Sequence, residues 1–135
     1  MENKLILTSL ENAVASLQDA LNEYAKEEDT YVRDAVIQRF EYTYELSHKL
    51  LKRHLEATAA NQDEIDTLSF QDLIRLGSER QLLRSGWEKW SLYRKLRGTT
   101  SHTSDEAKAQ EALKKIPEFY EEAHFLLQQL QAHHG

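Results

Sequence analysis

The chain has 135 residues, no Cys, one Pro and a formal net charge of −6 at pH 7. This length suits one domain with an ordinary hydrophobic core, so we expect a single domain over residues 1–135. The acidic balance argues against an indiscriminate nucleic-acid coat protein, and the lack of Cys excludes disulfides and thiolate chemistry. No apolar run reaches the roughly 20 residues of a membrane span, and no secretion signal begins the chain. We therefore expect a cytoplasmic protein that does not contact a membrane.

Apolar residues recur every three or four positions in the first half of the chain and predict two long amphipathic helices. The first helix is expected over about residues 3–27. A polar break follows at 27–30, where Thr30 can act as an N-cap. The second helix is expected to have an apolar stripe about seven turns long, made of Val32, Val36, Phe40, Thr43, Ser47, Leu50, Leu51 and His54.

The middle of the chain alternates between breaks and helix signals. Residues 58–69 are polar and predict a loop. Ser69, with an acidic residue three positions later, predicts the start of a short extra helix that ends near Leu83. Ser85-Gly86 then interrupts before the helical run WEKWSLYRKLR. We expect Gly98 to end that run in a left-handed conformation.

The last third predicts one more helical region, broken by a proline. Thr103 and Glu106 have the spacing of a capping box. Pro117 either kinks the region or occupies the first turn of a new helix. Four principal helices with short connections favour an all-α fold, an antiparallel four-helix up-and-down bundle with a short extra helix and a Pro-broken last helix. The expected stripe of the last region is Ile116, Phe119, Ala123, Leu126, Leu127 and Leu130.

Positive charge is concentrated in one window. Residues 75–97 carry seven Lys or Arg and two Glu, a net charge of +5, whereas the rest of the chain carries −11. Trp87, Trp90, Arg94 and Arg97 share one face of the expected helix, because they are spaced i, i+3, i+7, i+10. Such a face can stack bases and bind phosphates, and it can equally bury its Trp side chains under the aliphatic stems of Arg. Both interpretations remain open from the residue types.

Glu and His pairs at helical spacing raise the question of a metal site. Glu45-x-x-His48 and Glu121-x-x-His124 repeat an element of bundles that bind two metal ions. Both pairs lie off the apolar stripes of their helices, so they are expected on a solvated face. We therefore expect neither a metal nor another cofactor.

Arg97 and His102 are the candidate catalytic pair. Metal-independent RNA cleavage needs a group that accepts the 2′-hydroxyl proton and a cation that neutralises the charged phosphorane. A neutral His and an Arg can supply these functions. The alternative is a helix-terminal cation beside a polar loop His. The spacing alone does not separate these alternatives.

The order of the segments adds a resemblance. RDAVIQRFEYTYELSHKLLKRHLE, a Gly-containing turn, then RGTTSHTSDE at 97–106 and a Pro-containing final helix resemble the nucleotidyltransferase substrate-binding proteins of the HEPN superfamily. The similarity covers about residues 5–130. It implies a HEPN helical bundle that forms a homodimer and pairs with a minimal nucleotidyltransferase, which supplies the metal and the catalytic carboxylates. It also implies a toxin–antitoxin-type module, in which the helical member can be an endoribonuclease.

The resemblance assigns roles to single residues. Arg97 and His102 match the superfamily's Arg-x4–6-His motif, and Ser101 lies between them. Gly98 stands where the family usually has Asn. Ser104 stands where relatives carry a Tyr that partner enzymes can adenylylate, so Ser104 or Thr103 is the candidate modification site.

Two functions follow as hypotheses. The first is a helical subunit that binds a nucleotide or RNA and assembles with a nucleotidyltransferase. For this subunit the expected ligand contacts are Trp87, Trp90, Arg94, Arg97 and Ser101. The second is a metal-independent endoribonuclease that uses His102 as the base and Arg97 as the cation.

Overall fold

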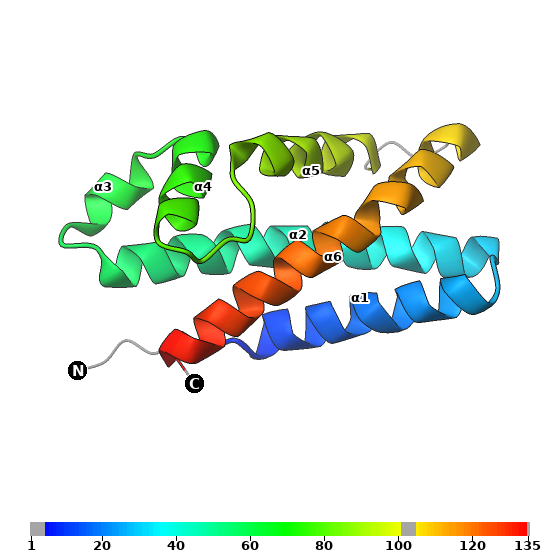
Figure 1. Cartoon of the computed structure of the whole chain (residues 1–135), viewed down its shortest axis with the longest axis horizontal. Helices are drawn as coiled ribbons and strands as arrows, with labels where there is room; N and C mark the ends of the chain where they lie inside the picture. Colours follow the sequence, from blue (N-terminus) through cyan, green and yellow to red (C-terminus); the bar gives the residue numbers. More distant parts are fainter. Residues whose placement is uncertain (1–4, 101–104, 135) are drawn as a thin grey trace.

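The computed structural model describes residues 5–100 and 105–134. Within these ranges the chain forms six α-helices and no β-strand, which confirms the all-α class (Figure 1). No helix in the same ranges is long and apolar enough to cross a membrane. The helices are α1 (Thr8–Lys26), α2 (Thr30–Thr58), α3 (Gln62–Asp66), α4 (Phe70–Glu79), α5 (Trp87–Thr100) and α6 (Glu106–His134).

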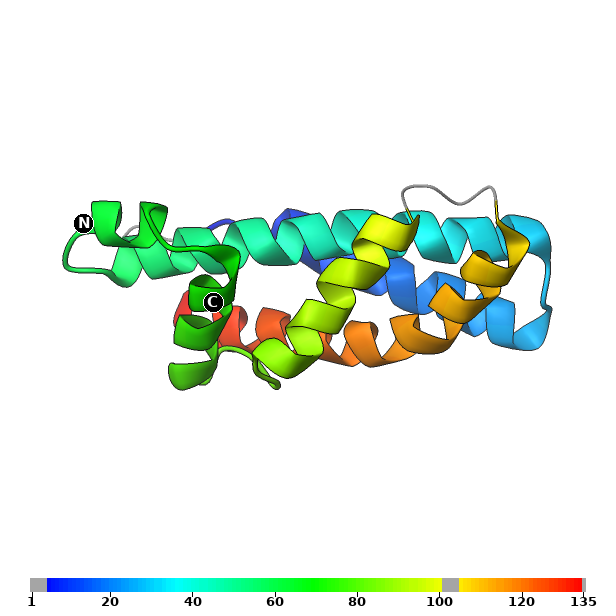
Figure 2. The ribbon, with the colours of Figure 1, turned by 90° about the horizontal axis from the view of Figure 1, so that it is seen from above.

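The four principal helices alternate in direction. In Figure 1, α1 and α5 run towards one end of the molecule, and α2 and α6 return towards the other. The long helices α1, α2 and α6 pack on one another, and α5 crosses α2 obliquely (Figure 2). Two short helices, α3 and α4, precede α5, where the sequence analysis expected one. The expected up-and-down bundle is therefore confirmed, with one more short helix than expected.

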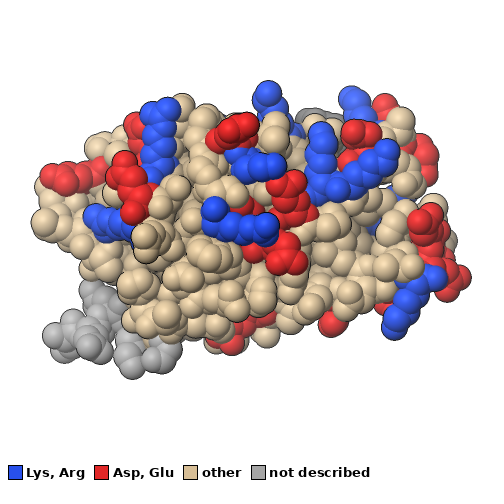
Figure 3. All heavy atoms as spheres, in the orientation of Figure 1, with Lys and Arg blue, Asp and Glu red and all other residues tan. Residues whose placement is uncertain are grey.

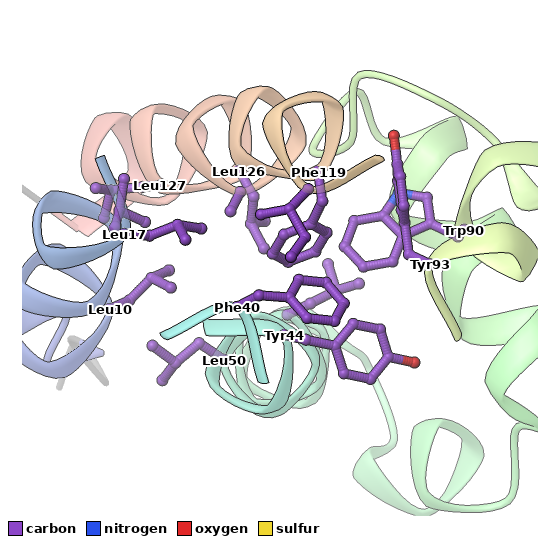
Figure 4. Packing of buried hydrophobic residues seen from close by; sticks show 14 of the residues in the cluster. Leu10, Leu17, Phe40, Tyr44, Leu50, Trp90, Tyr93, Phe119, Leu126 and Leu127 are labelled. Atoms are coloured by element: carbon purple, nitrogen blue, oxygen red, sulfur yellow. The ribbon is translucent and has the colours of Figure 1, made fainter. Parts of the chain in front are cut away.

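The predicted stripes form the core. On α2, every predicted position from Val36 to His54 is buried, and on α6 every predicted position from Ile116 to Leu130 is buried. Figure 4 shows leucines of α1, α2 and α6 on one side of the core and aromatic rings of α2, α5 and α6 on the other. Burying such side chains supplies most of the free energy that holds helices together. The labelled rings are Phe40, Tyr44, Trp90, Tyr93 and Phe119.

Several helix ends differ from the expectation. The first helix begins at Thr8, later than expected, and α4 ends at Glu79, before Leu83. Asp29, rather than Thr30, caps α2, because its carboxylate accepts from the N–H of Tyr31 at 2.6 Å. Ser69 caps α4 as predicted, with its hydroxyl 3.1 Å from the N–H of Asp72.

One prediction about a helix break is wrong, and one of the two alternatives for another is excluded. Gly98 lies inside α5, which continues to Thr100, and no described Gly has a positive φ. Gly can adopt the left-handed conformation that often ends a helix, but it is not obliged to, and Gly98 keeps a helical backbone. Pro117 lies inside a single helix, so the last region is not broken into two.

Histidines hold the two ends of the chain together near one end of the bundle (Figure 1). His54 of α2 is 3% exposed, and its Nδ1 lies 2.7 Å from Nε2 of His134. The Leu5 N–H donates to Nδ1 of His134 at 3.1 Å. Since Nδ1 of His134 accepts, its Nε2 carries the proton and donates to His54. Both rings must therefore be neutral for this chain of hydrogen bonds to exist.

We expect the stability of the protein to depend on the protonation of His54. Burial, together with the nearby His134, His133 and Arg80, lowers the pKa of His54 from 6.5 to about 4. Between these values the unfolded chain binds more protons at this residue, so the free energy of unfolding rises with pH from about 4 to 6.5. Below this window the folded protein must bind a proton at the buried His54. Its free energy of unfolding is then about 3 kcal/mol lower than above pH 6.5.

Urea unfolding at a series of pH values measures this effect. The difference in unfolding free energy between the wild type and the His54→Leu variant is expected to change across the window, whereas the His124→Gln control is expected to follow the wild type. A wild-type–variant difference that stays constant from pH 7 to pH 4 would contradict the assignment.

Candidate functional site

Helix α5 carries four of the residues proposed from the sequence, and the structure separates them. Trp90 is fully buried at 0% exposure and packs against Tyr93 and Phe119, with ring centroids 5.5 and 6.0 Å away. Trp87 is half-buried and Arg94 is exposed. Trp90 is therefore a core residue and does not reach a ligand at the surface of this chain.

Trp87 and Arg94 meet on the ring of Phe70, the first residue of α4. The Trp87 ring lies edge-on to Phe70 at 5.7 Å, and the guanidinium carbon of Arg94 lies 5.3 Å from the Phe70 centroid. His48 of α2 contacts the same ring at 4.6 Å, and burial lowers the pKa of this His. The sequence analysis missed Phe70. Its position directly after the N-cap Ser69, in a helix facing α5, was the available signal.

Gly77 allows α4 to place Phe70 there. A Cβ at Gly77 would lie 3.1 Å from a methyl carbon of Leu51 and 3.1 Å from one of Leu83. Such contacts are tighter than usual, so a side chain at Gly77 would require Leu51 and Leu83 to shift by a few tenths of an ångström. The aromatic and cationic residues Phe70, Trp87, Arg94 and His48 form a patch at the junction of α2, α4 and α5, which we call the Phe70 patch.

Arg97 is held by two carboxylates of α2. Its Nη1 donates to Oε2 of Glu41 at 2.8 Å, and its Nε donates to Oε1 of Glu45 at 3.1 Å. The hydroxyl of Thr100 also donates to Glu41 at 3.2 Å. The Arg97 side chain is 29% exposed. The bonds to the two carboxylates fix the direction of its guanidinium and neutralise much of its charge. The sequence analysis placed Glu45 on a solvated face without recognising that it would bind Arg97, and it did not single out Glu41.

His102, the second residue of the proposed Arg97–His102 motif, lies outside the described residues. Its neighbours Ser101, Thr103 and Ser104 also lie outside the described residues. On the far side, the carboxylate of Asp105 accepts from the N–H of Ala107 at 2.9 Å and of Lys108 at 3.4 Å, so it caps α6. Arg33 of α2 forms an ion pair with Glu106 in the first turn of α6. Both helices that flank 101–104 are therefore anchored to α2.

A buried carboxylate anchors the other end of α5. Glu122 of α6 is almost fully buried beside Ser85, just before α5, and its Oε2 has no hydrogen-bond partner among the described residues. Burial raises the pKa of Glu122, and burial and Glu122 in turn raise the pKa of Tyr93. Glu122 thus joins α6 to the turn that sets the start of α5.

The Glu-x-x-His pairs do not form a metal site. Glu45 binds Arg97, His48 packs on Phe70, and the ring of His124 stacks on Tyr120 at 5.7 Å. In the part of the chain that the structure describes, no three His, Cys, Asp or Glu side chains are grouped so that they could hold a metal ion. These contacts account for the positions of Glu45, His48 and His124.

Known proteins resemble the chain over almost its whole length. A family model described as nucleotidyltransferase substrate binding protein like matches residues 5–132. A Haemophilus influenzae protein named "Probable ribonuclease HepT" is 37% identical over 144 residues, which cover 96% of this chain and 94% of that protein.

Two solved structures share the fold. One, from Haemophilus influenzae, is described as revealing the fold of a substrate binding domain of a nucleotidyltransferase; it has a TM-score of 0.87 and 33% identity, and covers 93% of this chain and 99% of that one. The other, from Thermus thermophilus, has a TM-score of 0.72 and 30% identity, and covers 90% of this chain and 98% of that one. Together with the matching family model, these likenesses confirm the resemblance seen in the sequence: the chain belongs to the nucleotidyltransferase substrate-binding protein family.

Proposed function

We propose that this chain is a helical subunit that dimerises and pairs with a separate minimal nucleotidyltransferase as a cytoplasmic toxin–antitoxin-type module. In that pair it binds a nucleotide or RNA, and nucleotidyl transfer comes from the partner. The observation that carries this proposal is the likeness, over 93% of the chain, to a structure described as the substrate binding domain of a nucleotidyltransferase.

The Phe70 patch and Arg97 support a ligand at α5. Trp87 and Phe70 offer aromatic edges, and Arg94 is an exposed cation beside them. Aromatic rings with neighbouring guanidinium groups suit the bases and phosphates of nucleotides. The proposed ligand contacts are therefore Trp87, Arg94, Arg97 and Ser101, and Trp90 is left out because it is buried.

A second candidate function is metal-independent RNA cleavage by Arg97 and His102. The observation that favours it is the 37% identity to a protein named "Probable ribonuclease HepT". Arg97 lies in the last turn of α5, so His102 follows it on the connection to α6. Thr103 or Ser104 on the same connection is the proposed site at which the partner modifies the chain.

Co-purification tests the first proposal. When the chain and a minimal nucleotidyltransferase encoded beside it are produced together, we expect one complex in size-exclusion chromatography, with light scattering giving a mass that contains two copies of the 15.8 kDa chain. A nucleotidyltransferase encoded elsewhere in the same genome is the control and should elute separately. Separate elution of the neighbouring enzyme as well, at micromolar concentrations, would contradict the pairing.

A further inference from the structure

A groove of about 160 Å³ lies between α5 and α6, on the opposite side of α5 from Arg94 and Arg97. Its apolar floor is formed mainly by Leu92, Leu96 and Ala112, of which only Leu92 is exposed, at 48%. The remaining lining residues are Lys95 and Thr99 of α5 and Lys108, Glu111 and Lys115 of α6.

The lysines of this groove differ from Arg97 and Lys89 of α5, which are ion-paired. Arg97 binds Glu41 and Glu45, and Lys89 binds Glu118 at 2.7 Å. Among the described residues, Lys95, Lys108 and Lys115 form no ion pair, whereas Glu111 is the single acidic lining residue. In Figure 3, Lys and Arg side chains lie over the end of α5 and the beginning of α6, with Asp and Glu side chains among them. The groove therefore keeps positive charge that is not paired with a carboxylate, whereas Glu41 and Glu45 neutralise much of the charge of Arg97.

The position of Lys108 strengthens this observation. It is the third residue of α6, where the positive end of the helix dipole disfavours a cation. Asp105 and Glu106, which precede it, are already engaged with backbone N–H groups and with Arg33. A bound anion would relieve the repulsion between Lys108 and the helix end.

We propose that the groove between α5 and α6 binds the phosphate backbone of single-stranded RNA. This inference rests on the proposed function and adds a second contact surface for its RNA ligand, on the side of α5 opposite to the Phe70 patch and Arg97. Lys108 and Lys115 are seven residues apart on α6, which separates them by about 10 Å along the helix. One phosphate cannot contact both side chains closely, so the spacing fits a strand with successive phosphates. Leu92 offers an apolar surface for a base.

An acidic amphipathic helix from a protein partner fits the groove less well. Such a helix needs several apolar contacts spaced along the groove. Leu96 and Ala112 are buried, so Leu92 is the one large exposed apolar side chain among the lining residues. The attraction that the groove offers is mainly electrostatic, and a flexible polyanion can use it without a large apolar interface.

Fluorescence anisotropy with a labelled oligouridylate of about 12 nucleotides tests the proposal. The His102→Ala background is used throughout, so that the probe stays intact whether or not the chain is a ribonuclease. The test variant combines Lys95→Gln, Lys108→Gln and Lys115→Gln. The matched control combines Lys26→Gln, Lys49→Gln and Arg53→Gln, which removes the same charge from exposed cations elsewhere that form no ion pair among the described residues.

The groove variant is expected to bind the probe at least about tenfold more weakly at low salt. The slope of log K against log salt concentration should also fall by about 2, since each phosphate contact on a single strand contributes about 0.7. The control should stay close to the background protein. Equal losses in both variants would overturn the proposal, because they would show general charge attraction.

Two further outcomes also decide the question. Unchanged binding by the groove variant would overturn the proposal by placing RNA elsewhere. Binding of a poly-glutamate peptide, with no binding of the RNA probe, would overturn it in favour of an acidic protein partner. Because binding is measured on the isolated chain without catalysis, failure to pair with a nucleotidyltransferase or to cleave RNA does not affect the result.

Discussion

Wild-type protein is expected to cleave single-stranded RNA in the presence of EDTA, and the His102→Ala and Arg97→Ala variants are expected to lose that cleavage by about 10²–10⁴-fold. His102 would accept the 2′-hydroxyl proton as this oxygen attacks the phosphorus. The P–O5′ bond then breaks, which leaves a 2′,3′-cyclic phosphate on one fragment, and the departing 5′-oxygen takes a proton from the His102 imidazolium or from water. Arg97 would donate hydrogen bonds to the phosphorane oxygens as their negative charge grows. No metal ion takes part in these steps, so EDTA should not inhibit them.

The contacts of Arg97 shape what its variants should do. Glu41 and Glu45 hold the guanidinium through Nη1 and Nε, and neither bond uses Nη2. A Lys at this position could bind one carboxylate but could not also present a forked donor to phosphate. Arg97→Lys is therefore expected to retain the fold while losing most of the activity.

Controls on cleavage separate catalysis from contamination. Arg75→Ala and His124→Ala remove the same side-chain types from α4 and α6, away from the motif, and should cleave RNA as the wild type does. Initial rates on a labelled oligonucleotide, with circular dichroism of each variant, provide the measurement. Residual cleavage that is equal in the wild type, His102→Ala and Arg97→Ala would identify a contaminating nuclease and contradict the assignment.

Replacing Trp90 with Ala is expected to destabilise the protein by about 3–5 kcal/mol. Trp90 is the largest fully buried side chain, and its ring contacts aromatic rings of α2, α5 and α6. Removing it leaves a cavity where the three helices meet. In a chain of this size, the thermal midpoint should fall by about 10 °C or more.

The Trp90→Phe variant distinguishes a core role from a ligand contact. Phe keeps most of the ring and removes an indole N–H that has no hydrogen-bond partner among the described residues, so its cost should be well below that of Ala. In the His102→Ala background and well below its thermal midpoint, Trp90→Phe should bind the oligouridylate probe as the background protein does. A large loss of binding by a folded Trp90→Phe protein would return Trp90 to the ligand site.

Local signals predicted most of the fold. The stripes of α2 and α6 were read from apolar spacing because one face of a long helix must be buried whatever it packs against. Ser69 was recognised because an N-cap depends on its own neighbours. Gly98 was misread for the same reason: a Gly permits a helix to end, and only the packing around α5 decided that the helix continues to Thr100.

The sequence by itself determined the helical class and the family, because these depend on spacing and order along one chain, and on the same basis it predicts the Arg97–His102 pair. Tertiary structure decided which side of α5 keeps its charge. Glu41 and Glu45 lie more than fifty positions from Arg97 in the sequence, yet they neutralise it across α2, and Trp90 is enclosed by rings from two other helices. Ion pairing and burial depend on distances between helices, and residue order along a single helix does not contain those distances.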